Sequence, residues 1–300
     1  MPNISQIHVD KVLSELSIQW KNDAYVADAI FPKLAVKKHS DKYFVFDRDF
    51  KLPNTTRAIG AAAHEAEFGM SNATYQLAKQ ALKTYIADDE VDNYDMGTLK
   101  ADATEYLTDK ILMRKEVAAS ALLNATGTWS LQLSLAVAWS TNSTTSDPFP
   151  TFNTACSSLV SYGGRKPNFA MIPYKSYLAL KTHVSVLDRI KYTSAEFTVE
   201  MLKGLMDIPE IHIPSAVYDS ATDLTESMAF IMDTFAFIGY KTARPSPRSL
   251  SFAYNFEKLS PTVKTWRDEE RESEAIEVNS AFSLRVVCSL CGYLVKGTNA

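Results

Sequence analysis

The clearest pattern in the 300-residue chain is a helical repeat of apolar side chains between residues 98 and 124. Leu99, Ala103, Leu107 and Ile111 recur every four residues, which places them on one face of an α-helix, and no glycine or proline interrupts the segment. The charged pair at residues 114–115 breaks this apolar stripe. At about 1.5 Å per residue, the pattern predicts a helix about 40 Å long that ends near Gly127.

A different pattern precedes this helix. Residues 43–50 are aromatic and β-branched, and residues 74–88 read as a second strand region. The 51–73 stretch between them is rich in turn-forming and small residues. A loop longer than about 12–15 residues is uncommon inside a compact domain, so we expect a projecting hairpin that packs on a neighbour. The first 40 residues lack sustained periodicity, which favours an extended arm.

The second half of the chain divides at a polar, proline-containing break over residues 141–150. From 151 to 222 helical and strand patterns alternate, which predicts a compact α/β unit. Its most complete segment is 162–193: Gly163-Gly164 allows a turn, 168–173 suits a buried strand, 174–183 has the spacing of a helix, and a charged stretch follows. From Met228 the pattern becomes β, with strands expected at 228–239, 250–256, 262–268 and 275–295.

Charge and composition narrow the classes of function. The net charge is −4 and the sequence pI is near 5.8, which disfavours tight general binding of nucleic acid, since that binding needs clustered Lys and Arg. The three cysteines provide no disulfide framework and fit a reducing compartment. No apolar run approaches the ~18 residues of a membrane helix, and the N-terminus lacks the pattern of a secretory signal. We therefore expect the protein to remain in the cytosol or in an assembly built there.

Candidate chemistry is sparse. Cys288 and Cys291 form the one metal-like or redox-like motif, but no histidine lies near them and the surrounding residues 286–295 have strand composition. We interpret them as buried strand thiols. No His-Glu-x-x-His, Gly-x-Ser-x-Gly or phosphate-binding glycine motif occurs. We expect no catalytic residue, no cofactor and no metal.

The charged segments are candidates for contacts between subunits. Acidic clusters occur at residues 88–90 and 268–274, and such runs are mostly solvated hairpin tips or helix entries. The alternative is that they pair with basic segments of another subunit, such as residues 37–38, Arg244 or Arg248. The full set of candidate intersubunit contacts is Asp188, Arg189, Lys191, Arg244, Arg248, Glu269 and Glu270. For the first three, the simpler alternative is a solvated surface charge.

Several segments, taken in order, resemble the major capsid proteins of tailed bacteriophages of the Hong Kong 97 type. These segments are residues 25–32 with Val36 and 42–46, residues 81–90, residues 187–193, and residues 261–270, 275–278 and 292–295. The resemblance implies an α+β fold with an N-terminal arm (1–40), an extended β-hairpin loop (41–89), a peripheral domain with a long spine helix (90–149), an α/β axial domain (150–225) and return strands of the peripheral domain (226–300).

The resemblance also implies a function and partners. It points to a structural protein, not an enzyme, that forms hexamers and pentamers in an icosahedral shell around a double-stranded DNA genome. It implies a portal protein, possible scaffolding and decoration proteins, loose contact with packaged DNA, no membrane, and assembly in the bacterial host cytoplasm. Two alternatives stay open: an encapsulin-like protein compartment, and a metal or thiol enzyme that uses Cys288 and Cys291.

Overall fold

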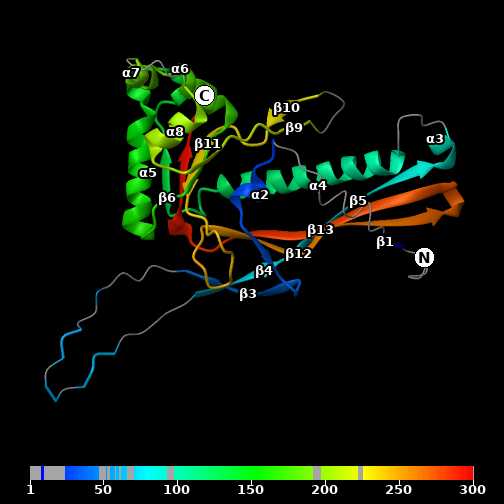
Figure 1. Cartoon of the computed structure of the whole chain (residues 1–300), viewed down its shortest axis with the longest axis horizontal. Helices are drawn as coiled ribbons and strands as arrows, with labels where there is room; N and C mark the ends of the chain where they lie inside the picture. The colour runs from blue at the N-terminus through cyan, green and yellow to red at the C-terminus, as the bar shows by residue number, and fades with distance from the viewer. Residues whose placement is uncertain are drawn as a thin grey trace.

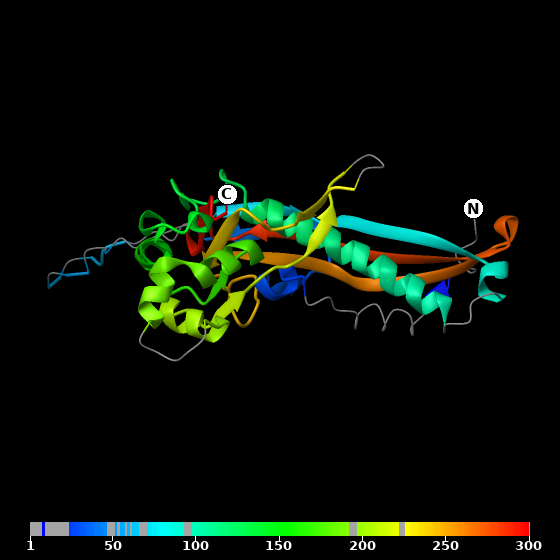
Figure 2. The ribbon, with the colours of Figure 1, turned by 90° about the horizontal axis from the view of Figure 1, so that it is seen from above.

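The computed structural model describes residues 8–9, 24–46, 52, 55–57, 59–60, 62–65, 71–92, 98–191, 197–221 and 226–299. Two parts are evident in Figure 1: a long sheet with one long helix lying along it, and a cluster of shorter helices around a second sheet. Seen from above in Figure 2, the long sheet and its helix extend away from the cluster as a narrow wing. Among the described residues, no helix has the length and apolarity that crossing a membrane requires.

The long sheet is built from strands that lie far apart in sequence. Its order is β1 (His8–Val9), β12 (Ala253–Asp268), β13 (Ser273–Val286) and β5 (Ala78–Ala87), all antiparallel, and β2 (Lys33–Ala35) runs parallel to residues 255–257 of β12. Helix α4 (Leu99–Leu123) packs against β13 and β5. The core beneath it consists of buried aliphatic side chains: Ile86, Leu107, Ile111, Val263, Ile276 and Val278.

The predicted long helix is confirmed as α4, and Leu107 and Ile111 are buried as the apolar stripe requires. Its second half differs from the expected pattern. The charged pair was expected to interrupt the buried face, but Lys115 is buried and continues a spacing of four residues from Ile111 to Ala119 and Leu123. The helix therefore has one continuous buried face, and Lys115 and the adjacent Glu116 are part of it.

The expected extended arm is wrong for part of its length. Residues 27–30 form a helical turn, α2 (Ala27–Ile30), in which Ile30 and the following Phe31 are fully buried against the rest of the chain. Residues 1–7 and 10–23 of the predicted arm lie outside the described residues. The first 40 residues indicated an arm because they lack sustained periodicity, but Val26, Ala27, Ile30 and Phe31 belong to the hydrophobic core.

The predicted hairpin is present at its base. Strand β3 (Ser40–Val45) pairs with β4 (Ser71–Gln76) in antiparallel register from Ser40↔Gln76 to Val45↔Ser71. Residues 47–50 of the predicted first strand lie outside the described residues. The described residues between 52 and 65 project from the body (Figure 1), and Leu52 and Ile59 are fully exposed. The predicted return strand is β4 and β5 in succession, so the loop is rooted directly in the long sheet.

The second sheet has the order β6 (Leu131–Ser134), β14 (Gly292–Lys296), β11 (Phe235–Gly239), β7 (Phe169–Met171) and β8 (Glu210–His212). Strand β11 is antiparallel to β14 and β7, whereas β6 and β8 run parallel to their neighbours. Helices α5 (Pro148–Gly163), α6 (Tyr174–Thr182), α7 (Val184–Ile190) and α8 (Val199–Met206) surround it. The turn, strand and helix expected within 162–182 are confirmed as Gly164 with φ 64°, β7 and α6.

Several segments with strand patterns have different limits in the structure. Residues 211–218 divide into β8 and β9 (Val217–Asp219), since Pro214 lies between them, and β9 pairs with β10 (Met228–Phe230). The strand expected at 228–239 is divided into β10 and β11, which lie in different sheets. The expected strands at 250–256 and 262–268 are one strand, β12, which passes Pro261 through shifts in register between Glu257 and Thr262.

The expected strand over 275–295 leaves the long sheet after Val286. A 3-10 turn, η5 (Ser289–Cys291), then leads into β14 of the second sheet. Cys288 precedes this turn and Cys291 is its last residue, so neither lies within a strand. The remaining elements are α3 (Asp88–Asp92), η2 (Trp139–Thr141), η3 (Thr144–Ser146) and η4 (Glu269–Arg271).

An aromatic cluster joins the two parts. The ring centroid of Phe252, which precedes β12, lies 5.6 Å from that of Phe237 on β11 and 5.0 Å from that of Phe169 on β7. Trp129 and Phe31 pack against the same cluster. Because these side chains come from both parts and from the α2 segment, one cluster of the hydrophobic core spans the two parts.

Candidate assembly surfaces

The far end of the long sheet is acidic. The β12–β13 hairpin turns there through η4, and α3 lies beside it, since the N–H of Asp88 donates to the carbonyl oxygen of Glu272 at 3.2 Å. Between them, residues 88–90 and 267–272 carry seven carboxylates and two guanidinium groups, a net charge of −5. The acidic run at 268–274 thus begins at a hairpin tip, as its composition predicts, and it ends in β13, where Glu274 pairs with Lys100.

Part of this charge is compensated internally. Arg267 donates to both carboxylate oxygens of Asp88, and this contact lowers the pKa of Asp88. The Nε of Arg267 is also 3.7 Å from Oε1 of Glu269. Glu270 and Glu272 are exposed. Val91 of α3 lies among these charges with 46% of its surface exposed. The end of the sheet thus combines a strong negative field with an exposed apolar side chain.

The base of the hairpin loop has the opposite character. A groove of about 270 Å³ opens there, with an aromatic and aliphatic floor and a rim of lysines. In the floor, the rings of Tyr75 and Phe256 stack at 4.6 Å, and the rings of Tyr43 and Phe256 lie 5.2 Å apart. The rim carries Lys37, Lys38 and Lys42 together with Asp41.

The lysine rim extends beyond the groove. Asp41 pairs with Lys38 at 3.0 Å, and this bond lowers the pKa of Asp41. The positive charges of Lys258 and, more weakly, Lys79 lower the pKa of the exposed His39 next to the rim. Five lysines therefore act on this surface against the single carboxylate of the rim, and the field around the groove is positive.

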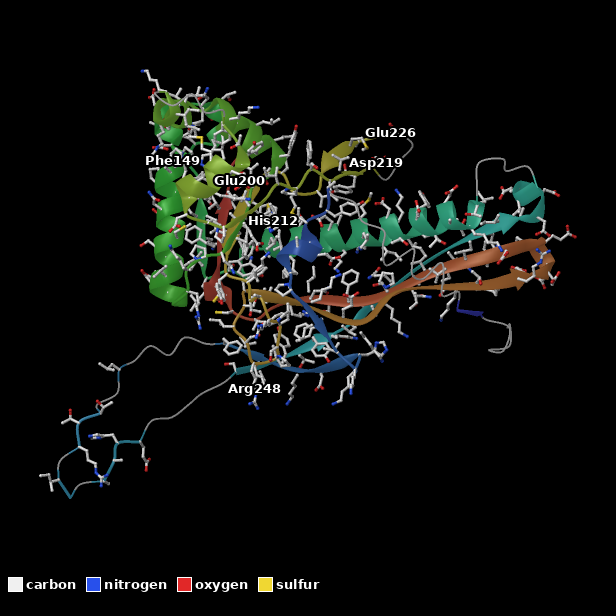
Figure 3. The ribbon with its side chains drawn as sticks, in the orientation of Figure 1. Phe149, Glu200, His212, Asp219, Glu226 and Arg248 are labelled. Carbon is white, nitrogen blue, oxygen red and sulfur yellow. The ribbon has the colours of Figure 1, made fainter. Side chains whose placement is uncertain are left out.

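The predicted basic residues Arg244 and Arg248 lie in the loop that borders this groove. Pro247, between them, lines the groove, and Arg248 is seen near β3 and β4 in Figure 3. Both arginines are exposed. The loop is held by Ser249, whose carbonyl oxygen accepts from the Tyr254 hydroxyl at 2.9 Å. The structure thus places Arg244 and Arg248 on the same side of the molecule as residues 37–38.

The other predicted contact residues lie on the helical cluster. Asp188 and Arg189 are exposed on α7, and Lys191 follows its end. The guanidinium of Arg189 lies 3.8 Å from the centre of the Phe149 ring, so it makes a cation–π contact within the chain. Three apolar side chains that were not predicted at the surface are exposed on α6 and α7: Leu178, Val184 and Leu187. Exposed apolar side chains next to charged residues suit a surface that another subunit covers.

A buried ionic anchor was also missed. Glu116 is completely buried, and its two carboxylate oxygens accept from the N–H groups of Val26, at 3.1 Å, and Ala27, at 2.8 Å. These are free N–H groups at the start of α2. Lys115 pairs with Asp28 of α2, which is also 3.2 Å from Lys33.

The pKa values of these carboxyls reflect their surroundings. Burial raises the pKa of Glu116, and the two N–H donors oppose this rise. For Asp28, burial also acts to raise the pKa, but the nearby Lys115 and Lys33 outweigh it and lower the pKa. The regular spacing of Ile111, Lys115, Ala119 and Leu123 was the available signal for a buried lysine.

The thiols show the properties of core side chains. Cys288 and Cys291 are buried, and the contact with Cys288 together with burial raises the pKa of Cys291 far above its ordinary value. A thiol that stays protonated at neutral pH is a poor nucleophile and a poor metal ligand. Among the residues that the structure describes, no three His, Cys, Asp or Glu side chains are grouped to hold a metal ion.

The hydrogen bonds of the buried pair Ser146 and His183 indicate a structural role. The His183 Nε2 lies 2.9 Å from the Ser146 hydroxyl, and its Nδ1 accepts from the N–H of Ser185 at 3.2 Å. Because Nδ1 is the acceptor, Nε2 carries the proton and donates to Ser146 in the neutral ring. The ring cannot take a proton from that serine in this tautomer, and it serves instead as the N-cap of α7.

Comparison with known proteins agrees with the described fold. No family model matches the chain. The major capsid protein of Burkholderia phage BcepMu is 23% identical over 298 residues, which covers 97% of this chain and 97% of that protein. A phage-related protein from Bordetella bronchiseptica RB50 has the same fold with a TM-score of 0.79, 23% identity and coverage of 97% of both chains.

A capsid structure shares the fold at much lower sequence identity. The mature capsid protein of bacteriophage PhiM1 gives a TM-score of 0.60 at 8% identity and covers 94% of this chain and 89% of that chain. The α+β fold with a long helix along a long sheet, expected from the sequence, is confirmed. Along nearly its whole length this chain is therefore similar to a phage major capsid protein, and it has the Hong Kong 97-like fold of phage capsid proteins.

Proposed function

We propose that copies of this major capsid protein assemble, in the host cytoplasm, into hexamers and pentamers of an icosahedral shell around a double-stranded DNA genome. The observation that supports this most directly is the similarity to a phage major capsid protein over 97% of both chains. In this proposal one vertex holds a portal protein, and scaffolding or decoration proteins assist the shell. The homologues favour a structural protein over an enzyme.

The exposed apolar residues of the loop support assembly. Leu52 and Ile59 are fully exposed on a segment that projects from the body. Burying a leucine or isoleucine side chain stabilises a contact by about 1.5–3 kcal/mol. A closed shell repeats each such contact many times, so modest contacts are sufficient to hold it together.

Electron microscopy of the expressed chain tests the proposal. We expect closed icosahedral particles, and after nuclease treatment of phage-derived particles we expect protected double-stranded DNA. Particles that hold a protein cargo and no nucleic acid would indicate a protein compartment of the encapsulin kind. Subunits that stay monomeric under all assembly conditions would contradict the proposal.

A shortened loop provides a second test. Replacing residues 51–70 with a short Gly-Ser linker keeps the β3–β4 pair closed, because that pair ends at Val45 and Ser71. We expect a folded, soluble subunit with an unchanged melting temperature that does not build stable shells. Particles of normal stability from this variant would show that the loop is dispensable.

A further inference from the structure

The acidic end and the basic groove of one chain cannot meet each other. Strand β13 connects them: Ser273 starts it at the acidic end, and at its other end the carbonyl oxygen of Val286 accepts from the hydroxyl of Tyr43 in the groove at 3.1 Å. The strand has 14 residues, so at about 3.3 Å per residue it separates the two surfaces by about 43 Å. Both surfaces are therefore available to other molecules.

The two surfaces complement each other in charge. The acidic end carries a net −5 over residues 88–90 and 267–272, whereas the groove is rimmed by Lys37, Lys38 and Lys42 against one aspartate. Of these lysines, Lys38 has an ion-pair partner within the chain, whereas Lys37 and Lys42 form no ion pair with the residues that the structure describes. Complementary fields of this kind steer association and fix the register of an interface.

The two surfaces also complement each other in polarity. The floor of the groove is apolar, with the stacked Tyr75 and Phe256 and the side chains of Leu34 and Val36. The acidic end presents the exposed Val91, which follows Asp88, Asp89 and Glu90 in α3. An apolar side chain next to carboxylates fits an apolar floor that is rimmed by ammonium groups.

We propose that the acidic end of one subunit, formed by α3 and the β12–β13 hairpin tip, docks in the lysine-rimmed groove of a second copy. This inference rests on the proposed function and names the contact surfaces. Each subunit offers one acidic end and one groove, so the contact is head-to-tail and every subunit can take part in two such contacts. A head-to-tail contact generates closed rings when the rotation between subunits closes.

A charge-reversal cycle tests the contact. The acidic-end variant carries Glu269→Lys and Glu270→Lys, the groove variant carries Lys37→Glu and Lys42→Glu, and a third chain carries all four changes. All four side chains are exposed, so each subunit should fold with an unchanged melting temperature. A matched control, Glu200→Lys with Glu226→Lys, makes the same change in net charge as the acidic-end variant, on α8 and beside β10, away from both surfaces (Figure 3).

The readout is the subunit concentration at which shells form, measured by light scattering and microscopy. We expect each reversal alone to raise this concentration by about tenfold or more, because like charges then face each other. The variant with all four substitutions should recover most of the loss. The control should form shells at a concentration within about threefold of the wild-type value. The effect of each reversal should shrink as salt is added.

The possible results distinguish a failure of the docking proposal from a failure of the proposed function. If the wild-type chain forms no shells, the proposed function fails. If the wild type forms shells and the acidic-end variant assembles as the control does, the docking proposal is overturned and the function stands. The docking proposal would also be overturned if the variant with all four substitutions assembled no better than either reversal alone, because the two surfaces would then not be partners.

Discussion

Removing the carboxylate of Glu116 should loosen the attachment of the α2 segment to the long helix. In the structure this side chain is fully buried and accepts from the N–H groups of Val26 and Ala27. Substitution by alanine leaves both donors without an acceptor in a region closed to water. We expect Glu116→Ala to lower the free energy of unfolding and to expose residues 26–31 to local opening.

The magnitude follows from the two hydrogen bonds. A hydrogen bond to a charged group contributes about 1.5–3 kcal/mol net, and two such bonds give about 3–6 kcal/mol. The cost of burying the carboxylate, seen in its raised pKa, offsets part of this sum. We therefore expect a loss of about 2–4 kcal/mol for Glu116→Ala. Glu116→Gln keeps one oxygen acceptor and should lose about half as much.

Urea denaturation of unassembled subunits measures this loss, with the fluorescence of the buried Trp129 and Trp139 as the signal. Hydrogen exchange at Val26 and Ala27 gives a local readout and should accelerate in the alanine variant. Glu105→Ala on the same helix is the control, since that side chain is only half-buried. A loss below about 0.5 kcal/mol with unchanged exchange at Val26 would refute the anchoring role.

Three further changes test the core. Asparagine at Leu107 and Ile111 should cost about 2 kcal/mol or more at each position, and a double variant that keeps its melting temperature would show that this face is not core. Gly292→Ala places a methyl group 2.5 Å from an aromatic ring carbon and should cost about 1–3 kcal/mol by calorimetry, whereas Gly127→Ala, with open space around it, should cost nothing measurable. Burial lowers the pKa of His183, so the neutral ring contributes its full stability above the ordinary histidine pKa near 6.5, and this contribution is lost as the pH falls below that value. Between pH 7 and 5 the melting temperature of His183→Asn should therefore fall less than that of the wild type. Equal slopes of melting temperature against pH would contradict this.

Sequence patterns predicted the elements whose limits depend on local chemistry. The long helix follows from four-residue spacing without Gly or Pro, and β7 and α6 follow from the turn signals that bound them. The acidic run at 268–274 was expected at a hairpin tip, and the structure places Glu269–Arg271 there, whereas residues 273–274 belong to β13. These predictions depended on neighbours within a few residues, which the sequence displays directly.

The failures all depend on contacts distant in sequence. Glu116 is buried because two N–H groups about 90 residues earlier need an acceptor. Strand β12 continues past Pro261 because a shift in register accommodates it against β13. The chain leaves the long sheet after β13 because the partners of β14, which are β11 and β6, lie in the second sheet.

Individual contact residues were predicted from the sequence, but the way in which they combine into surfaces was not. The basic groove forms only when β2 and the β3–β4 pair meet β12 and the loop around Pro247, and no local pattern reveals that meeting. The exposed apolar residues of α7 were missed because an apolar position in a helical pattern predicts core. Asp188, Arg189 and Lys191 remain predicted contacts.

The root of the hairpin loop has a mechanical consequence. The loop returns through β4 into β5, which is paired with β13 along its ten residues. A pull on the loop along the direction of β5 therefore loads all the hydrogen bonds of this ladder at the same time, in shear, and does not open them one after another like a zipper. If the loop grips a neighbouring subunit while DNA presses the shell outward, the tension passes through the long sheet, where the strand resists it over its whole length.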